Sequence, residues 1–257
     1  MNWQPLYEQL AEQLKAGAEL PFWQDFYVSI CKAFLVADRW QLYLKGIATT
    51  LQLTVIALAI GVVLGMAVAV IRTAHDQQLP GRRNPILGLI NVLCKVYTTV
   101  IRGTPMMVQL LIWGFVIFKS SRNYAMVGAL GLGINSGAYV AEIVRGGLMS
   151  VDGGQMEAGR SLGLNYFDTM RFIVVPQAFK NILPSLGNEF ITLFKDTSLV
   201  SAIGGAELVY YAKGIGGKIY DYMYPYIGIA VMYLIFVLIL TWLQGKLERR
   251  LRQSDRR

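Results

Sequence analysis

The stretch IATTLQLTVIALAIGVVLGMAVAVI, residues 47–71, carries no charged side chain. A helix needs roughly 20 consecutive apolar residues to cross the hydrocarbon core of a bilayer, and this stretch is long enough. The composition of the whole chain agrees, because 54% of its 257 residues are hydrophobic and 16% are charged. Soluble domains usually carry about 25% charged residues. The sequence therefore predicts an all-α integral membrane protein.

Four further membrane spans follow the first. The last, Tyr222–Gly245, has no charged residue, Tyr124–Val144 has one, and Ile182–Ile203 has several within it. The remaining span, Asn91–Phe118, contains the sequence Arg102-Gly103-Thr104-Pro105. A proline inside a helix removes a backbone donor and kinks the helix. We therefore expect five spans, the second of them kinked.

The positions of the basic residues predict the orientation of the chain. The net charge is +8, and the Lys and Arg residues fall mainly in loops and in the C-terminal tail. This pattern indicates basic segments retained in the cytoplasm rather than binding to nucleic acid. A cytoplasmic C-terminus and five spans place the N-terminus outside. We expect an extracytoplasmic or interfacial segment (1–44), a transmembrane domain (45–250) and a basic cytoplasmic tail (251–257).

Two smaller patterns concern helix packing. Leu6, Leu10 and Leu14 recur every four residues and predict a short amphipathic helix. Such a helix suits a membrane surface or a partner, and a marginally ordered tail is equally compatible with the pattern. Gly61 and Gly65 form a small-xxx-small pair in the first span, which favours close contact with another helix.

A polar segment, VDGGQMEAGRSLGLN (151–165), separates the third and fourth spans and is predicted to be cytoplasmic. Gly154–Leu162 can form a short helix, with Glu157 in the first turn, where a carboxylate complements the positive helix end. Gly163 is placed to end this helix. Asn165 can cap a second helix, because Asp168 follows three residues later as in a capping box. The predicted arrangement is helix, stop, helix.

This loop also contains apolar side chains that could contact another protein: Met156, Leu162, Leu164, Phe167 and Met170. A short rigid element with protruding apolar residues suits docking into a groove of a soluble protein. An ordinary capped loop is compatible with the same local pattern, so the residues alone leave both interpretations open.

Several stretches together resemble the polar amino-acid permeases of ABC importers. The loop resembles the EAA loop of these permeases, with Glu157-Ala158-Gly159, then Gly163, then Val175-Pro176. Gly159 stands where the family usually has a second alanine. The matching stretches are KGIATTLQLT (45–54), IRGTPMMVQLL (101–111), NSGAYVAEIVRGG (135–147), GQMEAGRSLG (154–163), FIVVPQAF (172–179), LPSLGNEF (183–190) and KDTSLVSAIG (195–204).

The resemblance implies a type I importer permease with a five-helix core in a bacterial cell membrane. It implies a second permease subunit, the same or a paralogue, and an external binding protein that delivers an amino acid. It also implies a cytoplasmic ATPase dimer, which binds ATP and Mg and receives the loop at 151–170 as a coupling helix. The coupling residues would be Glu157, Ala158, Gly159, Leu162 and Gly163. The chain itself lacks a G-x-x-x-x-G-K-[ST] phosphate loop, so no cofactor is expected in it.

Charged residues inside the spans are candidates for substrate binding, because they are costly in a membrane. Glu189 and Asp196 are seven residues apart and share one helix face, and Thr192 lies nearby. Two carboxylates facing a pathway could bind the ammonium group or a cationic side chain of an amino acid. Alternatively, either acid pairs with Lys195 or Arg102, or sits at the membrane interface.

The proline break in the second span supplies further candidates, namely Arg102, Thr104 and Gln109. Irregular backbone at membrane depth is tolerated where it lines a cavity or packs in protein. Arg102 could hold the substrate carboxylate, or it could neutralise Glu189. Glu142 and Arg145, three residues apart, are predicted to form an intrahelical pair.

Three other classes of protein fit the sequence less well. An ATP-independent secondary carrier or channel for small polar solutes remains the alternative, although five spans and a docking element argue against it. A membrane scaffold is disfavoured by the charges inside spans. An enzyme is disfavoured because the chain has no Ser/His/Asp set or phosphate loop. Its two cysteines and single histidine give no metal-ligand spacing.

Overall fold

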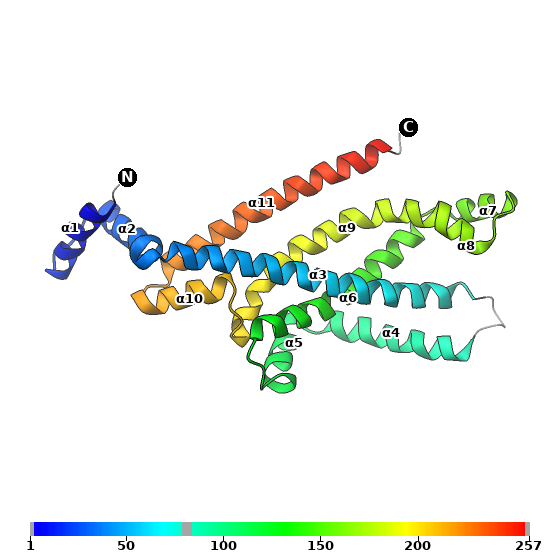
Figure 1. The fold of residues 1–257 in the computed structure, drawn as a ribbon, viewed down its shortest axis with the longest axis horizontal. Coiled ribbons are helices and arrows are strands. Elements are labelled where there is room, and N and C mark those ends of the chain that lie inside the picture. The colour runs from blue at the N-terminus through cyan, green and yellow to red at the C-terminus, as the bar shows by residue number, and fades with distance from the viewer. Residues whose placement is uncertain (1–2, 79–83, 255–257) are drawn as a thin grey trace. The chain divides into compact units, whose positions relative to one another are not determined.

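The structure is a computed structural model that describes residues 3–78 and 84–254. All regular elements among these residues are helical (Figure 1). In chain order they are α1 (Gln4–Lys15), α2 (Phe22–Ile30), η1 (Cys31–Leu35), η2 (Val36–Asp38), α3 (Trp40–Asp76), α4 (Pro85–Gly103), α5 (Met106–Ile112), η3 (Trp113–Ile117), α6 (Tyr124–Met149), α7 (Gly153–Ser161), α8 (Tyr166–Thr169), η4 (Met170–Val174), α9 (Val175–Asp196), η5 (Thr197–Ile203), α10 (Leu208–Ile219) and α11 (Met223–Ser254).

Four of the described helices, α3, α4, α6 and α11, are long and apolar enough to cross a membrane. The fourth predicted span corresponds to α9 and η5, and α9 is 22 residues long but carries charged residues. The all-helical membrane architecture is confirmed, whereas the count of five spans stays a prediction. Part of the predicted basic tail, residues 255–257, lies outside the described residues.

The second predicted span differs from expectation. Its helix does not kink at the proline but ends at Gly103, and α5 starts afresh at Met106. Thr104 has an extended backbone, with φ −117° and ψ 145°. A residue before proline is driven out of the helical region by the proline ring, and Pro105 itself has no N–H to donate. The expected kink is therefore wrong, and the chain contains a complete break.

The described residues form two compact units. The first unit spans 1–50 and 206–236, and its core includes Tyr43, Leu208 and Ile215. Helix α1 forms where the leucine spacing predicts it, and it buries Leu10. The fully buried Glu207 caps α10 by accepting from the backbone N–H groups of the two residues that follow Leu208. Whether α1 lies on a membrane surface stays a prediction.

The second unit spans 51–205 and 237–257, and α6 lies at its centre. Helix α3 approaches α6 closely at the two glycines of its small-xxx-small pair. A Cβ added to Gly61 would stand 2.7 Å from Ser136 Oγ, and one added to Gly65 would stand 2.6 Å from Val140 Cβ. Only a residue without a side chain fits such an approach. The close helix contact predicted from Gly61 and Gly65 is confirmed.

Candidate functional site

The break between α4 and α5 is bridged by the buried side chain of Gln109. Its Nε2 lies 2.7 Å from the backbone oxygen of Ile101, and 3.1 Å and 2.8 Å from the backbone and hydroxyl oxygens of Thr104. The last carbonyls of a helix have no intrahelical donor, and Pro105 cannot supply one. Gln109 therefore replaces the donors that the break removes.

The same glutamine connects the break to α6. Asn135 Nδ2 donates to Gln109 Oε1 at 3.0 Å. The next residue, Ser136, is fully buried, and its hydroxyl donates to Glu189 Oε1 of α9 at 2.7 Å. Two adjacent residues of α6 thus join the α4–α5 break on one side to the Glu189 carboxylate on the other. This row of hydrogen bonds is called the α6 polar row below.

Of the predicted substrate residues, Thr104 and Gln109 are linked to each other and to Asn135, and Glu189 is linked to the adjacent Ser136. Arg102 is exposed, and its guanidinium lies over the ring of Tyr139, 5.2 Å from the centroid. Among the described residues Arg102 forms no ion pair with Glu189. The geometry therefore does not support Arg102 as the residue that neutralises Glu189.

The other two predicted substrate residues lie beyond the row. Thr192 is exposed, and Asp196 is half-buried as the last residue of α9. Asp196 is still close enough to interact electrostatically with Glu189, as expected for residues seven apart on one face. Neither side chain takes part in the hydrogen bonds of the row.

Sequence reasoning did not assign Asn135 and Ser136, which form the middle of the row. A signal was present, because an adjacent amide and hydroxyl inside an otherwise apolar span need partners in a membrane. Their partners, Gln109 and Glu189, are distant in sequence, so the pattern alone gives no pairing. Tyr139, one helical turn beyond Asn135, was missed for the same reason.

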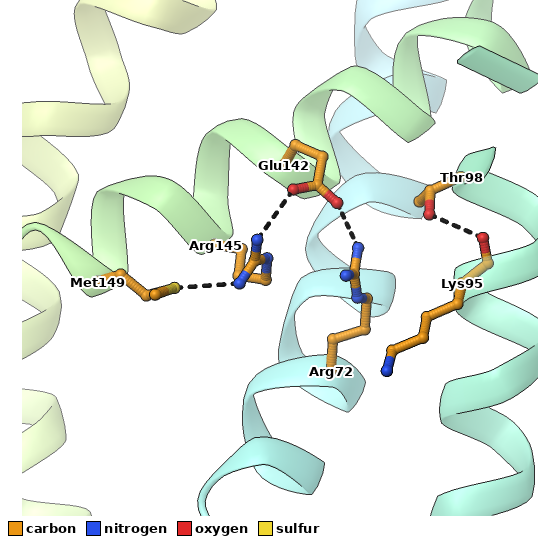
Figure 2. Close-up of polar contacts among 6 residues, drawn as sticks. All are labelled: Arg72, Lys95, Thr98, Glu142, Arg145 and Met149. Carbon is orange, nitrogen blue, oxygen red and sulfur yellow. Dashed lines mark hydrogen bonds and ion pairs between the residues drawn. The ribbon is translucent and has the colours of Figure 1, made fainter. Parts of the chain in front are cut away.

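A second charged cluster lies on α6 near its C-terminal end. The predicted pair of Glu142 and Arg145 is confirmed, with Arg145 Nη2 3.3 Å from Glu142 Oε2. The other carboxylate oxygen of Glu142 accepts from Arg72 of α3, a contact that the sequence did not predict. Figure 2 shows both guanidinium groups converging on this carboxylate.

The polar loop has the predicted helix–stop–helix geometry. Helix α7 ends at Ser161 with Leu162 as its C-cap, and Gly163 follows with a φ of +85°, in the left-handed region that glycine adopts without strain. The N–H of Gly163 donates to Arg160 O at 3.0 Å and that of Leu164 to Gly159 O at 3.1 Å. These two bonds form a Schellman motif, which satisfies the last carbonyls of the helix.

The second helix of the loop is capped as predicted. Asn165 Oδ1 accepts from the backbone N–H of Asp168 at 2.9 Å, and the two side chains also bond to each other at 2.6 Å. The start of the first helix differs from expectation. Asp152 caps it by accepting from the N–H of Gly154 at 2.7 Å, so α7 begins at Gly153. Glu157 consequently lies beyond the first turn, and its predicted interaction with the helix end is wrong.

The loop buries one side and exposes the other. Gly159 is buried, and a Cβ added to it would stand 2.5 Å from Thr169 Cγ2. Leu162 and Phe167 point outward, with 80% and 70% of their surface exposed. Glu157 and Ala158 are also exposed, whereas Met156, Leu164 and Met170 are half-buried. Tyr166 donates to Gln77 at the end of α3, and Figure 1 shows α7 and α8 at one end of α9.

The comparison with known protein families identifies the chain. A family model described as binding-protein-dependent transport system inner membrane component matches residues 86–253. The chain belongs to this family. It is therefore a membrane-embedded permease component of a transport system.

Curated relatives agree with the family. The chain is 36% identical over 217 residues to the arginine transport system permease protein ArtQ of Bacillus subtilis (strain 168), which covers 82% of this chain and 93% of the relative. It is also 36% identical over 215 residues to the glutamine transport system permease protein GlnP of Escherichia coli (strain K12), with 82% and 93% covered.

Two solved structures resemble the fold. One, described as an amino acid ABC transporter with histidines, has 41% sequence identity and a TM-score of 0.73, and the match covers 82% of this chain and 94% of that chain. The other is the MetNI methionine ABC transporter in an inward-facing conformation, with 18% identity, a TM-score of 0.69, and 84% and 99% covered. The second likeness concerns the fold alone.

Proposed function

We propose that this chain is the transmembrane permease subunit of an ATP-driven amino-acid importer. Membership of the binding-protein-dependent transport family supports a permease that works with an ATPase and a substrate-binding protein. Two of its relatives are named as arginine and glutamine transport system permeases, which supports an amino acid as the substrate. The observation that carries the proposal is the α7–α8 loop, where a capped rigid element exposes Leu162 and Phe167 beside the ends of membrane helices.

The loop serves as the coupling element. ATP is hydrolysed outside the bilayer, so a movement of the ATPase must reach the membrane helices through a stiff connection. The Schellman motif at Gly163 and the cap at Asn165 fix the angle between α7 and α8. Exposed Leu162 and Phe167 then provide apolar anchors for a groove of the ATPase, since such anchors supply most of the binding energy of an interface.

The α6 polar row is the substrate site. Glu189 has one carboxylate oxygen fixed by Ser136, and its other oxygen accepts no hydrogen bond from the described residues. A half-buried carboxylate in a membrane helix is expensive without a partner, and the ammonium group or a cationic side chain of an amino acid supplies one. In this proposal Thr104 and Arg102, which are exposed at the break, bind the polar end of the same substrate.

The remaining assignments concern partners and topology. The permease pairs with a second copy or a paralogue, two ATPase subunits each receive one α7–α8 loop, and a binding protein delivers the amino acid from outside. The C-terminus and the loop face the cytoplasm and the N-terminus faces outward, as the distribution of basic residues supports. ATP and Mg bind to the ATPase rather than to this chain.

The test is reconstitution into vesicles with the ATPase and the binding protein. We expect uptake of a radiolabelled amino acid, chosen by screening arginine, glutamine and histidine against the binding protein, only with ATP on the side of the α7–α8 loop. Vesicles that contain the permease alone should take up nothing. Uptake by the isolated permease without ATP would support a secondary carrier or channel instead.

A further inference from the structure

The ion-pair cluster at Glu142 holds more positive charge than that carboxylate can neutralise. Arg72 and Arg145 each give one hydrogen bond to it. Their Nε atoms have no acceptor within the described part of the chain, and both atoms are buried. The side chains of Arg72 and Arg145 are 13% and 29% exposed, so Arg145 in particular remains open to the surroundings. One negative charge thus faces two guanidinium groups.

A third cation comes from the neighbouring helix. Lys95 is exposed on α4, and Figure 2 shows its side chain extending from α4 toward the helix that carries Arg72. Arg72 interacts electrostatically with Cys94, the residue before Lys95. Arg72 of α3 and Lys95 of α4 therefore lie at a similar height along the two helices. The ammonium group of Lys95 has no hydrogen bond or ion pair with the described residues. The next acid along α3, Asp76, contacts His75 instead.

The position of the cluster matters for what could neutralise it. Arg72 lies one turn before the end of α3 at Asp76, and Arg145 lies one turn before the end of α6 at Met149. At a rise of about 1.5 Å per residue, each is about 6 Å from its helix end. The predicted spans 47–71 and 124–144 also end one residue before Arg72 and Arg145. Long basic side chains at the end of a span reach toward the lipid headgroups, so we expect the cluster at the border between hydrocarbon and headgroups.

The surface around Lys95 is apolar. Val92, Leu93 and Val96 of α4 are 53%, 61% and 53% exposed. Such side chains suit contact with acyl chains, whereas the three cations suit a phosphate. Arginine guanidinium groups bind phosphate oxygens with paired donors, and lysine adds a point charge. Basic clusters between membrane helices near a charged leaflet are suited to anionic headgroups.

We propose that Arg72, Lys95 and Arg145 bind the phosphate of an anionic phospholipid headgroup in the leaflet at the C-terminal ends of α3 and α6. Glu142 positions the two guanidinium groups and leaves the site with an excess of two positive charges. The bound lipid joins α3, α4 and α6 at this level and neutralises charges that are otherwise costly in the membrane.

The test compares lipid retention by the full-length permease. The protein is purified with phosphatidylglycerol or with phosphatidylcholine, and bound lipid is counted by native mass spectrometry. We expect phosphatidylglycerol to be retained preferentially. The variant K95Q should retain it roughly fivefold less, and K95Q/R145Q less again by a similar factor, since each basic residue contributes comparably. The matched control K119Q/R122Q removes two exposed cations before α6 and should retain lipid like the parent.

K95Q alters an exposed side chain and should therefore leave the helix contacts in place. An unfolding temperature equal to that of the parent protein in phosphatidylcholine would verify this. Equal retention of the two lipids by the parent protein would overturn the proposal. Equal retention of phosphatidylglycerol by K95Q/R145Q and the parent would also overturn it. In a further arm, inorganic phosphate is added to protein in phosphatidylcholine nanodiscs. We expect no thermal stabilisation there, and stabilisation that disappears in K95Q/R145Q would mean that the cations bind free phosphate rather than lipid.

Discussion

Polar side chains are buried around α6, whereas apolar side chains are exposed on the α7–α8 loop. Ser136 and Gln109 are buried inside a unit built of membrane helices, and Leu162 and Phe167 stand 80% and 70% exposed on a polar loop. Each arrangement reverses the usual burial of its residue type. The buried polar groups are hydrogen-bonded within the protein, whereas Leu162 and Phe167 gain little from folding, so the proposed substrate site has a structural role as well and the proposed docking surface has none.

The largest effect is expected from making the exposed side of the loop polar. The variant L162D/F167D should weaken binding of the ATPase by about a hundredfold or more, because truncating one apolar anchor of an interface already costs about 2 kcal/mol or more. Both side chains are exposed, so the permease should still insert and fold. Co-purification of the ATPase and stimulation of its activity measure the loss.

The matched control is Y220D, which makes an equally drastic change at a side chain that is 95% exposed on another segment. Its ATPase binding should equal that of the parent protein. If L162D/F167D still binds and stimulates the ATPase, Leu162 and Phe167 are not its docking site. The difference between the loop and α6 would then be one of packing and not of function.

The second-largest effect on transport is expected from a change at Glu189 in the α6 polar row. E189Q keeps an oxygen to accept from Ser136 Oγ but removes the charge. Losing a charged partner in a partly dehydrated site costs about 1.5–3 kcal/mol, which is about a tenfold to hundredfold change in apparent affinity. Transport by the assembled complex at saturating binding protein measures it.

Two comparisons sharpen this prediction. S136A removes the hydrogen bond and keeps the charge, so it should have the smaller effect if Glu189 meets the substrate. D196N removes a charge outside the row and tests whether any acid of α9 serves. Unaltered uptake by E189Q would eliminate the substrate role. The ATPase should remain bound to all three variants, in contrast to the loop variant.

Much of the fold follows from local sequence. The apolar stretch at 47–71 needs only its length to predict a span, and Gly163 needs only its freedom at positive φ to end α7. Asn165 finds its partner Asp168 within the same turn. Such features depend on residues that are near one another in the chain, so a single sequence contains the information for them.

The rest depended on partners far apart in sequence. A kinked helix and a broken helix at Pro105 have the same local sequence pattern. The break is stabilised by hydrogen bonds from Gln109, which in turn accepts from Asn135. Arg72 meets Glu142 across 70 residues, which no spacing rule predicts. Glu157 was misplaced for a smaller reason: Asp152 starts α7 one residue earlier than expected and caps it with its own side chain.

A moderate effect is expected where the polar row supports the break. Q109L keeps the side-chain bulk but removes the donors to Ile101 O and Thr104 O and the acceptor for Asn135. A buried polar group left without a partner costs about 1–3 kcal/mol. We expect a lower unfolding temperature and about tenfold weaker uptake. Unchanged values for both would mean that water or lipid replaces Gln109 without cost.

The smallest effect is expected from G159A, which tests how closely the loop must pack. The new Cβ would stand 2.5 Å from Thr169 Cγ2, and Thr169 is fully buried. Overpacking of this kind costs about 1–3 kcal/mol, while alanine in a helix gains about 1 kcal/mol over glycine. The difference predicts a net cost of about 1 kcal/mol and about a fivefold loss of ATPase stimulation. G159A/T169S should restore part of it, because serine lacks the methyl group yet keeps the hydroxyl that donates to Asn165 O at 2.9 Å, and that hydroxyl oxygen would still stand 2.9 Å from the new Cβ. Full stimulation by G159A alone would show that the α7–α8 angle tolerates the shift, and that the loop needs its exposed side chains but not this close contact.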